Sequence, residues 1–197
     1  MVDEAIECFY LMKEKGFDPK TETCNCILSL LSRKEAKAKE MLAIMECFGV
    51  KPNIVTYNTL VQGYSSRGRI EGARMVIREM RSKGFEPDLQ TYNPILSWMC
   101  SEGRACEVLK EMKEVGLVPD SVSYNILIRG SCNRGDLQIA FAYKDEMMKK
   151  GFAPTLYTYN TLIHGLFMEN KIEAADILIK EIREKGIALM PSRTTYS

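Results

Sequence analysis

An asparagine recurs at a nearly constant interval along the chain, and its amide is the side chain best suited to repeated chemistry. The spacings between successive copies are 33, 35, 32 and 35 residues, at Asn25, Asn58, Asn93, Asn125 and Asn160. The amide offers two N–H donors and one acceptor oxygen, so a row of such groups could hydrogen-bond the edges of nucleic-acid bases. The structural interpretation is that asparagine near a helix start satisfies free backbone N–H groups.

A second polar residue accompanies each asparagine and follows the proline that closes each copy. These residues are Asn53, Asp88, Asp120, Thr155 and, with Pro191 aligned to Pro87, Ser192. All four residue types are good helix N-caps, so a purely structural role is again available. Capping alone does not explain why a variable residue is paired with a recurring amide. In each copy, the recurring asparagine and the variable residue after the closing proline could together read one base of single-stranded RNA, and we call the two a reader pair. Spacing alone leaves both interpretations open.

Amphipathic helices would position these side chains, and the segment 54–88 shows the pattern most clearly. Gly68 separates two apolar stripes at helical spacing, and Gly84 and Pro87 close the segment. The stripes are Tyr57, Leu60, Val61 and Tyr64, then Ile70, Ala73, Val76, Ile77 and Met80. The segment is therefore predicted to be a helical hairpin. We expect first helices to line an inner, concave face and second helices an outer face.

The same pattern recurs along the chain. We predict a partial repeat at 1–20 with only its second helix, repeats at 21–53, 54–88, 89–120, 121–155 and 156–192, and the start of another at 193–197. The helices of the first full repeat are predicted near 23–33 and 34–47. Pro94 follows Asn93 directly, which predicts a slightly later helix start there. Because such repeats pack on their neighbours, the predicted fold is all-α, a right-handed superhelical solenoid of helix-turn-helix repeats.

These motifs resemble those of the pentatricopeptide repeat family, in its P class. The resemblance rests on V-T-Y-N-T-L at 55–60, Glu-Met at 79–80 and 111–112, and Gly-x-x-Pro-Asp at 84–88. It also rests on an alanine in the middle of each second helix, at Ala73, Ala105, Ala140 and Ala175. The resemblance implies a plant organellar protein that binds single-stranded RNA, with repeats running along the RNA from 5′ to 3′.

The resemblance also implies which bases are read. Asn58 with Asp88, and Asn93 with Asp120, imply uracil. Asn25 with Asn53 implies a pyrimidine with cytosine favoured, Asn125 with Thr155 a pyrimidine, and Asn160 with Ser192 cytosine. The implied pyrimidine-rich site is 5′-Y-U-U-Y-C-3′. Bases would be sandwiched by the residue three before each asparagine, at Val55, Gln90, Val122 and Tyr157. Glu22 holds that place in the first repeat and departs from the usual valine.

Positive charge is scarce at the places where the family contacts phosphate. The family's lysine near the end of each first helix is replaced by Arg33, Ser66, Ser101, Asn133 and Met168. Arg67 and Arg134 lie one residue later, and we predict that they substitute. The net charge is only +1. Because phosphate contacts supply much of the affinity and its salt dependence, we expect weak, salt-sensitive binding.

The sequence gives no support for catalysis, a metal or another cofactor. His164 is the only histidine and is expected at the surface, and no phosphate-binding glycine loop is present. The seven cysteines match no zinc pattern and are expected to be mostly buried, reduced thiols. We therefore expect a non-enzymatic adaptor. The alternative is a protein-interaction solenoid of the tetratricopeptide-repeat type, which the near-neutral charge favours.

The ends of the sequence predict a piece of a longer protein. Met1 falls within a second helix, Ser197 falls at the opening of a repeat, and no signal peptide, transit peptide or membrane-length apolar run is present. By resemblance, the full protein is expected in a plant mitochondrion or chloroplast, in RNA processing, stability, splicing or translation. Truncated ends would expose apolar helix faces, so end-to-end self-association is also expected.

Overall fold

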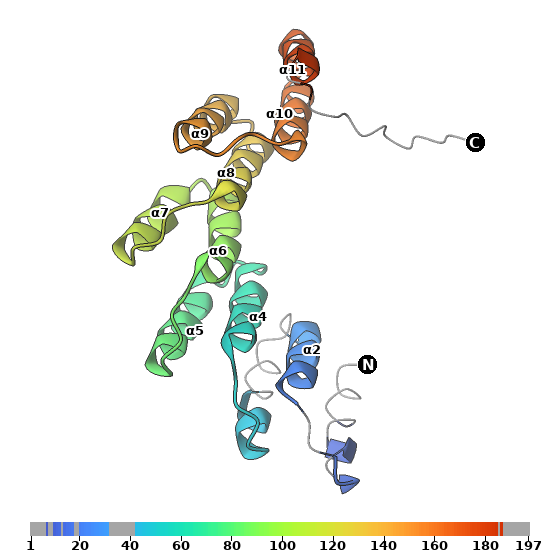
Figure 1. Cartoon of the computed structure of the whole chain (residues 1–197), viewed down its shortest axis with the longest axis vertical. Helices are drawn as coiled ribbons and strands as arrows, with labels where there is room; N and C mark the ends of the chain where they lie inside the picture. Colours follow the sequence, from blue (N-terminus) through green and yellow to red (C-terminus); the bar gives the residue numbers. More distant parts are fainter. Residues whose placement is uncertain are drawn as a thin grey trace, which may run out of the picture. The chain divides into compact units, whose positions relative to one another are not determined.

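Helices account for all the regular secondary structure in the described part of the chain. The computed structural model describes residues 7, 10–12, 14–17, 20–31, 42–184 and 186. Its labelled helices are α2 (Thr21–Leu31), α4 (Ile54–Ser65), α5 (Ile70–Ser82), α6 (Leu89–Ser101), α7 (Ala105–Glu114), α8 (Ser121–Asn133), α9 (Leu137–Lys149), α10 (Leu156–Met168) and α11 (Ile172–Glu184) (Figure 1). The predicted orphan helix lies largely outside the described residues, as does the end from residue 187.

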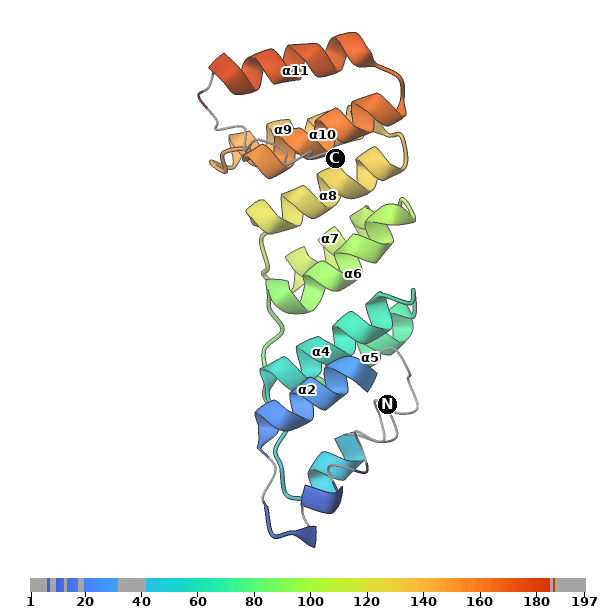
Figure 2. The same ribbon diagram turned by 90° about the vertical axis from the view of Figure 1, so that its right-hand side faces the viewer.

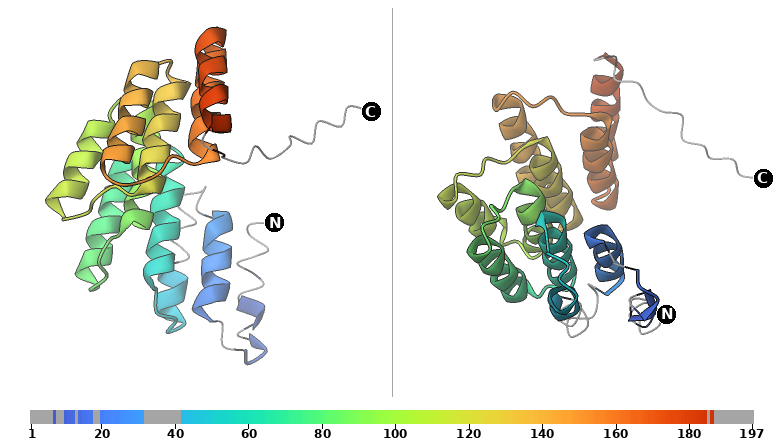
Figure 3. Two further views of the ribbon diagram at one scale, coloured as in Figure 1. Left: turned by 45° about the horizontal axis from the view of Figure 1, so that its top comes forward. Right: turned by 60° about the horizontal axis from the view of Figure 1, so that its bottom comes forward.

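Two units make up the chain, Met1–Trp98 and Met99–Ser197, with the border inside α6. In the first unit, α4 packs on its hairpin partner α5 and on the preceding first helix α2. In the second unit, α8 packs on α9 and on the next first helix α10, which contacts α11 (Figures 2 and 3). The repeats at 54–88 and 121–155 therefore pack both within their hairpins and against a neighbouring repeat.

The core matches the predicted stripes. Every residue of the two stripes predicted for 54–88 is buried, and Ala73, at 0% exposure, lets α4 and α5 approach closely. Between these helices Gly68 has a φ of +70°, a left-handed conformation that glycine adopts without steric cost. The predicted break at Gly68 is confirmed.

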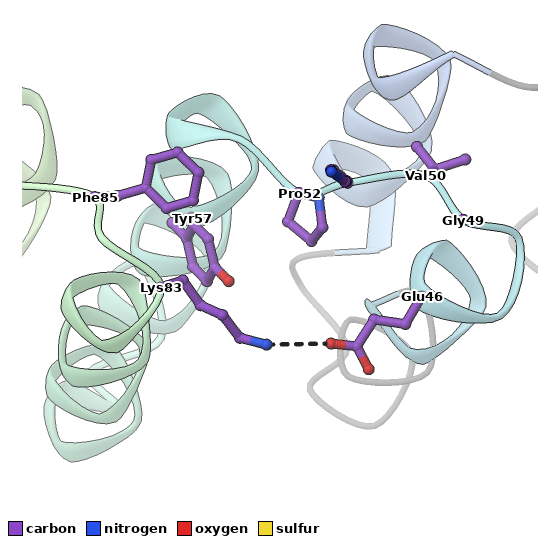
Figure 4. Close-up of a pocket in the computed structure, with 8 residues that line it drawn as sticks. Glu46, Gly49, Val50, Pro52, Tyr57, Lys83 and Phe85 are labelled. Atoms are coloured by element: carbon purple, nitrogen blue, oxygen red, sulfur yellow. Dashed lines mark ion pairs between the residues drawn. The ribbon is translucent and has the colours of Figure 1, made fainter.

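The closing segment returns the chain to the start of the next repeat. Gly84 has a φ of +84°, and Phe85 N–H then donates to the Met80 carbonyl oxygen at 3.0 Å. The Phe85 ring lies 5.6 Å, centroid to centroid, from the Tyr57 ring, beside a hollow of about 410 Å³ that also holds the Lys83–Glu46 ion pair (Figure 4). This turn explains the recurring glycine of the Gly-x-x-Pro motif, because Gly84 adopts a left-handed conformation that other residues adopt only with strain.

A tyrosine in the first helix is tied to a glutamate in the second helix of the same repeat. Tyr124 Oη donates to Glu146 Oε1 at 3.0 Å, and Tyr159 Oη to Glu181 Oε1 at 2.9 Å. Burial, followed by this hydrogen bond, raises the pKa of Tyr124 to about 12, so its hydroxyl stays a proton donor at neutral pH. The aromatic residue preceding Asn125 and the one preceding Asn160 are therefore held in place.

Helix α6 corrects one prediction. It begins at Leu89, directly after Asp88, and contains Pro94 as its sixth residue. The expected later start is wrong because Asp88 Oδ1 accepts from Thr91 N–H at 3.0 Å and so begins the helix before the proline. The first helix of the first full repeat was predicted at 23–33 and spans Thr21–Leu31.

Glycines in the first helices allow close approach between neighbouring repeats. A Cβ added at Gly165 of α10 would lie 2.8 Å from Cys132 Cβ of α8, and one added at Gly130 would lie 2.5 Å from Cys100 Sγ. Carbon atoms in contact are normally 3.5–4.0 Å apart, so a side chain at either position would push the helices apart.

Replacing Ser65 with alanine should stabilise the protein by about 1 kcal/mol. Ser65 is 1% exposed, and its hydroxyl has no hydrogen-bond partner among the described residues. Alanine removes this buried polar group and is a better helix former. Chemical denaturation would measure the gain. Ser131→Ala is the matched control and should destabilise, because the Ser131 hydroxyl bonds Cys100. A loss of stability in Ser65→Ala would contradict the prediction.

Candidate nucleic-acid interface

The residues after the closing prolines cap the first helices, as the sequence indicates. Asn53 Oδ1 accepts from Thr56 N–H at 3.0 Å, and Asp120 Oδ1 accepts from Ser123 N–H at 2.8 Å. Thr155 N–H donates to Thr158 Oγ1 at 3.1 Å. In each case a hydrogen bond joins the capping residue to the third residue of the helix that follows. The capping residue is therefore fixed at the start of that helix.

The recurring asparagines do something different, because they bond across the joint between repeats. In three of them, Oδ1 accepts from a hydroxyl at the third residue of the next repeat's first helix. The bonds are Thr56 Oγ1 to Asn25 at 2.6 Å, Thr91 Oγ1 to Asn58 at 2.7 Å, and Thr158 Oγ1 to Asn125 at 2.8 Å. All three threonine side chains are 0% exposed. The interpretation that the asparagine satisfies free backbone N–H groups of its own helix is therefore wrong for the bonds that Asn25, Asn58 and Asn125 make here.

These bonds bring together three of the predicted reader pairs. Asn25 Nδ2 donates to Asn53 Oδ1 at 3.2 Å, and Thr91 Oγ1 lies 2.7 Å from Asn58 Oδ1 and 3.1 Å from Asp88 Oδ1. Thr158 Oγ1 lies 2.8 Å from Asn125 Oδ1 and 3.5 Å from Thr155 Oγ1. Asn25, Asn58 and Asn125 are each partly exposed.

The remaining predicted readers are placed singly. Asn93 lies in α6 and Asp120 caps α8, which belong to different units. Asn160 lies in α10 and is exposed, whereas Ser192 falls outside the described residues. These two pairs stay predictions.

The residues predicted to sandwich bases are exposed in the first turns of their helices. Val55, Val122 and Tyr157 are 52%, 53% and 50% exposed, and Gln90 is also exposed. Arg129 Nη1 of α8 donates to Tyr157 Oη of α10 at 3.5 Å. The positive guanidinium of Arg129 therefore lies beside Tyr157, the only aromatic residue among the four predicted to sandwich bases. Arg129 itself was not predicted as a site residue.

Two of the three arginines predicted to contact phosphate are described, and both are exposed. Arg67 follows α4, and Arg134 follows α8 with its Nη2 paired to Asp136 Oδ2 at 2.6 Å. Arg33 lies outside the described residues. Nine residues separate Asn125 from Arg134, which at 1.5 Å per residue is about 13 Å along the helix. Any phosphate at Arg134 must compete with Asp136.

The cysteines divide between core and surface. Cys24, Cys100 and Cys132 are buried, whereas Cys26, Cys47 and Cys106 are exposed, so the prediction of mostly buried thiols holds for half of the described six. Burial raises the pKa of Cys24 and of Cys132 to about 11, which keeps them as neutral thiols. The described residues contain no cluster of three His, Cys, Asp or Glu residues suited to a metal. Their helices are also too short or too polar to cross a bilayer.

Sequence reasoning missed the buried hydroxyls that organise this interface. A threonine or serine precedes each recurring asparagine by two residues, at Thr23, Thr56, Thr91, Ser123 and Thr158. The recurrence was available as a signal. What it could not reveal is that the hydroxyl bonds the asparagine of the preceding repeat rather than its own.

Stacked helical hairpins with a capped polar edge define the class of α-solenoid repeat proteins, which confirms the predicted fold class. The PPR repeat family model matches residues 52–101, 90–133 and 119–168, and the PPR repeat model matches residues 1–17 and 157–187. The chain belongs to the pentatricopeptide repeat family.

Relatives and solved structures agree with this assignment. A mitochondrial pentatricopeptide repeat-containing protein of Arabidopsis thaliana is 67% identical over 184 residues, covering 75% of this chain and 29% of the relative. The chain thus spans less than a third of that relative. The maize pentatricopeptide repeat protein PPR10 is 25% identical with a TM-score of 0.54, covering 96% of this chain and 33% of PPR10.

A second solved structure shares the fold alone. The PPR domain of Arabidopsis thaliana protein-only RNase P 1, solved in complex with tRNA, has a TM-score of 0.58 and 18% identity, covering 83% of this chain and 89% of that domain.

Proposed function

We propose that this chain binds single-stranded RNA and selects one base per repeat, as a non-enzymatic part of a plant organellar protein. The observation that supports this most directly is the repeated joint. At three joints, the asparagine and the capping residue of one repeat are held side by side by one buried hydroxyl from the next repeat. Asn25, Asn58 and Asn125 are also partly exposed, which a purely structural contact does not require. The mitochondrial name of the 67% identical relative supports an organellar location.

The chemistry of the capping residue favours particular pyrimidines. Asp88 uses Oδ1 on Thr91, which leaves Oδ2 as an acceptor for the N3–H donor of uracil. Asn53 uses Oδ1 on Thr56 N–H, which leaves Nδ2 as a donor for the N3 acceptor of cytosine. The neighbouring asparagine amide then donates to a carbonyl oxygen of the same pyrimidine. This chemistry agrees with the proposed site 5′-Y-U-U-Y-C-3′.

Charge sets the expected affinity. The net charge is +1, and Arg134 is already paired with Asp136. Few phosphates can therefore be neutralised, so we propose that base contacts and the exposed Val55, Val122 and Tyr157 side chains supply most of the binding energy.

Fluorescence anisotropy on the 197-residue chain would test the proposal. Labelled 5′-CUUCC-3′ should bind at least tenfold more tightly than 5′-GAAGG-3′ at low salt, because a single good base contact is worth about 1–3 kcal/mol. The preference should persist between 50 and 200 mM salt while both affinities fall. Equal binding of the two RNAs would contradict base selection. Binding of neither would favour the protein-interaction alternative.

A further inference from the structure

We propose that the buried hydroxyls of Thr56, Thr91 and Thr158 are positioning residues that fix the amide orientation of the asparagine in the preceding repeat. This inference rests on the proposed function, since it explains how the reader is held. Each repeat would then select its base with the help of a residue that belongs to the next repeat. Thr91, which serves Asn58, carries the argument in most detail.

The hydrogen bonds around Thr91 show that its hydroxyl proton has one acceptor at short distance. Asp88 N–H donates to Thr91 Oγ1 at 3.2 Å, so the hydroxyl already accepts a bond and has a single proton to give. Asn58 Oδ1 lies 2.7 Å away and Asp88 Oδ1 lies 3.1 Å away. The shorter distance is typical of an O–H···O bond, whereas N–H···O bonds are usually 2.9–3.0 Å. The atom of Asn58 that faces Thr91 is therefore its oxygen.

This assignment has a direct consequence for recognition. The oxygen and nitrogen ends of an asparagine amide have nearly the same shape, so only hydrogen bonds decide which end faces a ligand. With Oδ1 held by Thr91, Asn58 presents the N–H donors of Nδ2. Because Thr91 is 0% exposed, water does not compete for its hydroxyl. The reader thus arrives at the RNA with its donor already oriented.

The same arrangement occurs in both units. Thr56 and Thr158 are also 0% exposed and give bonds of 2.6 and 2.8 Å to Asn25 and Asn125. Thr56 Oγ1 and Thr158 Oγ1 likewise accept from the backbone N–H of Asn53 and Thr155, at 3.0 and 3.1 Å. Three independent joints thus share one hydrogen-bond pattern, which makes a general positioning role more economical than three separate structural ones.

Thr91→Val tests the role because valine keeps the shape and removes the hydroxyl. Binding would be measured with four RNAs that differ only at the second position of 5′-CUUCC-3′, the base assigned to Asn58. We expect the preference for uracil, at least tenfold in the unmodified chain, to fall to about threefold or less. Preference at the fourth position should be unchanged. Thr91→Ser restores the hydroxyl and should restore the preference at the second position.

Thr158→Val is the matched control within the same chain. It should relax selection at the fourth position, assigned to Asn125, and leave the second position intact. A merely structural role would weaken binding of every RNA alike and would not be rescued by serine at the level of base choice. If Thr91→Val keeps full uracil preference, or if both valine variants lose preference everywhere, the inference is overturned.

A measurement without RNA separates this inference from the proposed function. The side-chain amide of Asn58 should give one sharp pair of NMR signals in the unmodified chain and in Thr91→Ser. In Thr91→Val, the pair should broaden or double, because both amide orientations become populated. An unchanged pair overturns the inference even if RNA binds. Failure of the unmodified chain to bind RNA overturns the proposed function and leaves this readout in place.

Discussion

Replacing Asp88 with asparagine should move the base preference of the second repeat from uracil to cytosine. Asp88 Oδ1 accepts from Thr91 N–H at 3.0 Å, and asparagine can keep that bond with its own oxygen. The remaining atom then changes from the acceptor Oδ2 to the donor Nδ2. Uracil carries a donor at N3 and cytosine an acceptor, so the sign of the contact is inverted. A change of about 1–3 kcal/mol, tenfold or more in relative affinity, is expected.

Anisotropy with 5′-CUUCC-3′ and 5′-CCUCC-3′ would measure the exchange. The matched variant is Asn53→Asp, which should move the first position toward uracil by the same chemistry. Both variants should keep the stability of the unmodified chain within a few tenths of a kcal/mol, because asparagine and aspartate are equally good N-caps. If both variants bind every RNA more weakly without any change in preference, the capping residues do not read bases.

Introducing a methyl group at Gly165 should cost about 2 kcal/mol of stability. The added Cβ would lie 2.8 Å from Cys132 Cβ and 2.9 Å from its Sγ, which forces α8 and α10 apart. Cβ is fixed to the backbone, so no rotamer change relieves the contact. The loss should appear even though alanine favours helix by about 1 kcal/mol over glycine. Urea denaturation of Gly165→Ala would measure it.

A double-mutant cycle identifies the cause of that loss. Cys132→Gly removes the opposing Cβ and should destabilise by itself, through lost packing and helix propensity. Combined with Gly165→Ala, it should be more stable than the sum of the two single changes by about 1 kcal/mol or more. Strict additivity would mean that the two positions do not meet, and that Gly165 is there for another reason.

Periodicity was sufficient to predict the helices and the core. The stripes in 54–88 are buried because two amphipathic helices joined by a short turn can remove both apolar stripes from water by packing them together. The capping residues were also predictable, because aspartate and asparagine directly before a helix have a strong local preference. These features depend on residues close in sequence.

Features that depend on distant residues were not predictable in this way. The hydrogen bond from Thr91 to Asn58 joins residues 33 apart, and nothing local to Thr91 indicates its acceptor. The later start predicted for the helix at Pro94 was wrong because the preference of proline for the first turn is weaker than the N-cap that Asp88 provides. Composition could not separate the exposed Cys26, Cys47 and Cys106 from the three buried cysteines, because it does not report which face of a helix a residue occupies.

The hydroxyl that reaches back from Thr91 to Asn58 also changes what counts as a transferable module. A segment cut at 54–88 carries its reader and its capping residue but leaves the hydroxyl partner of that reader in the neighbouring sequence. Grafted into a foreign array, the segment would depend on whatever residue the host supplies at the third position of the next helix. The smallest portable unit is therefore 54–91, and arrays assembled from such overlapping pieces should keep the selectivity that shorter cassettes lose.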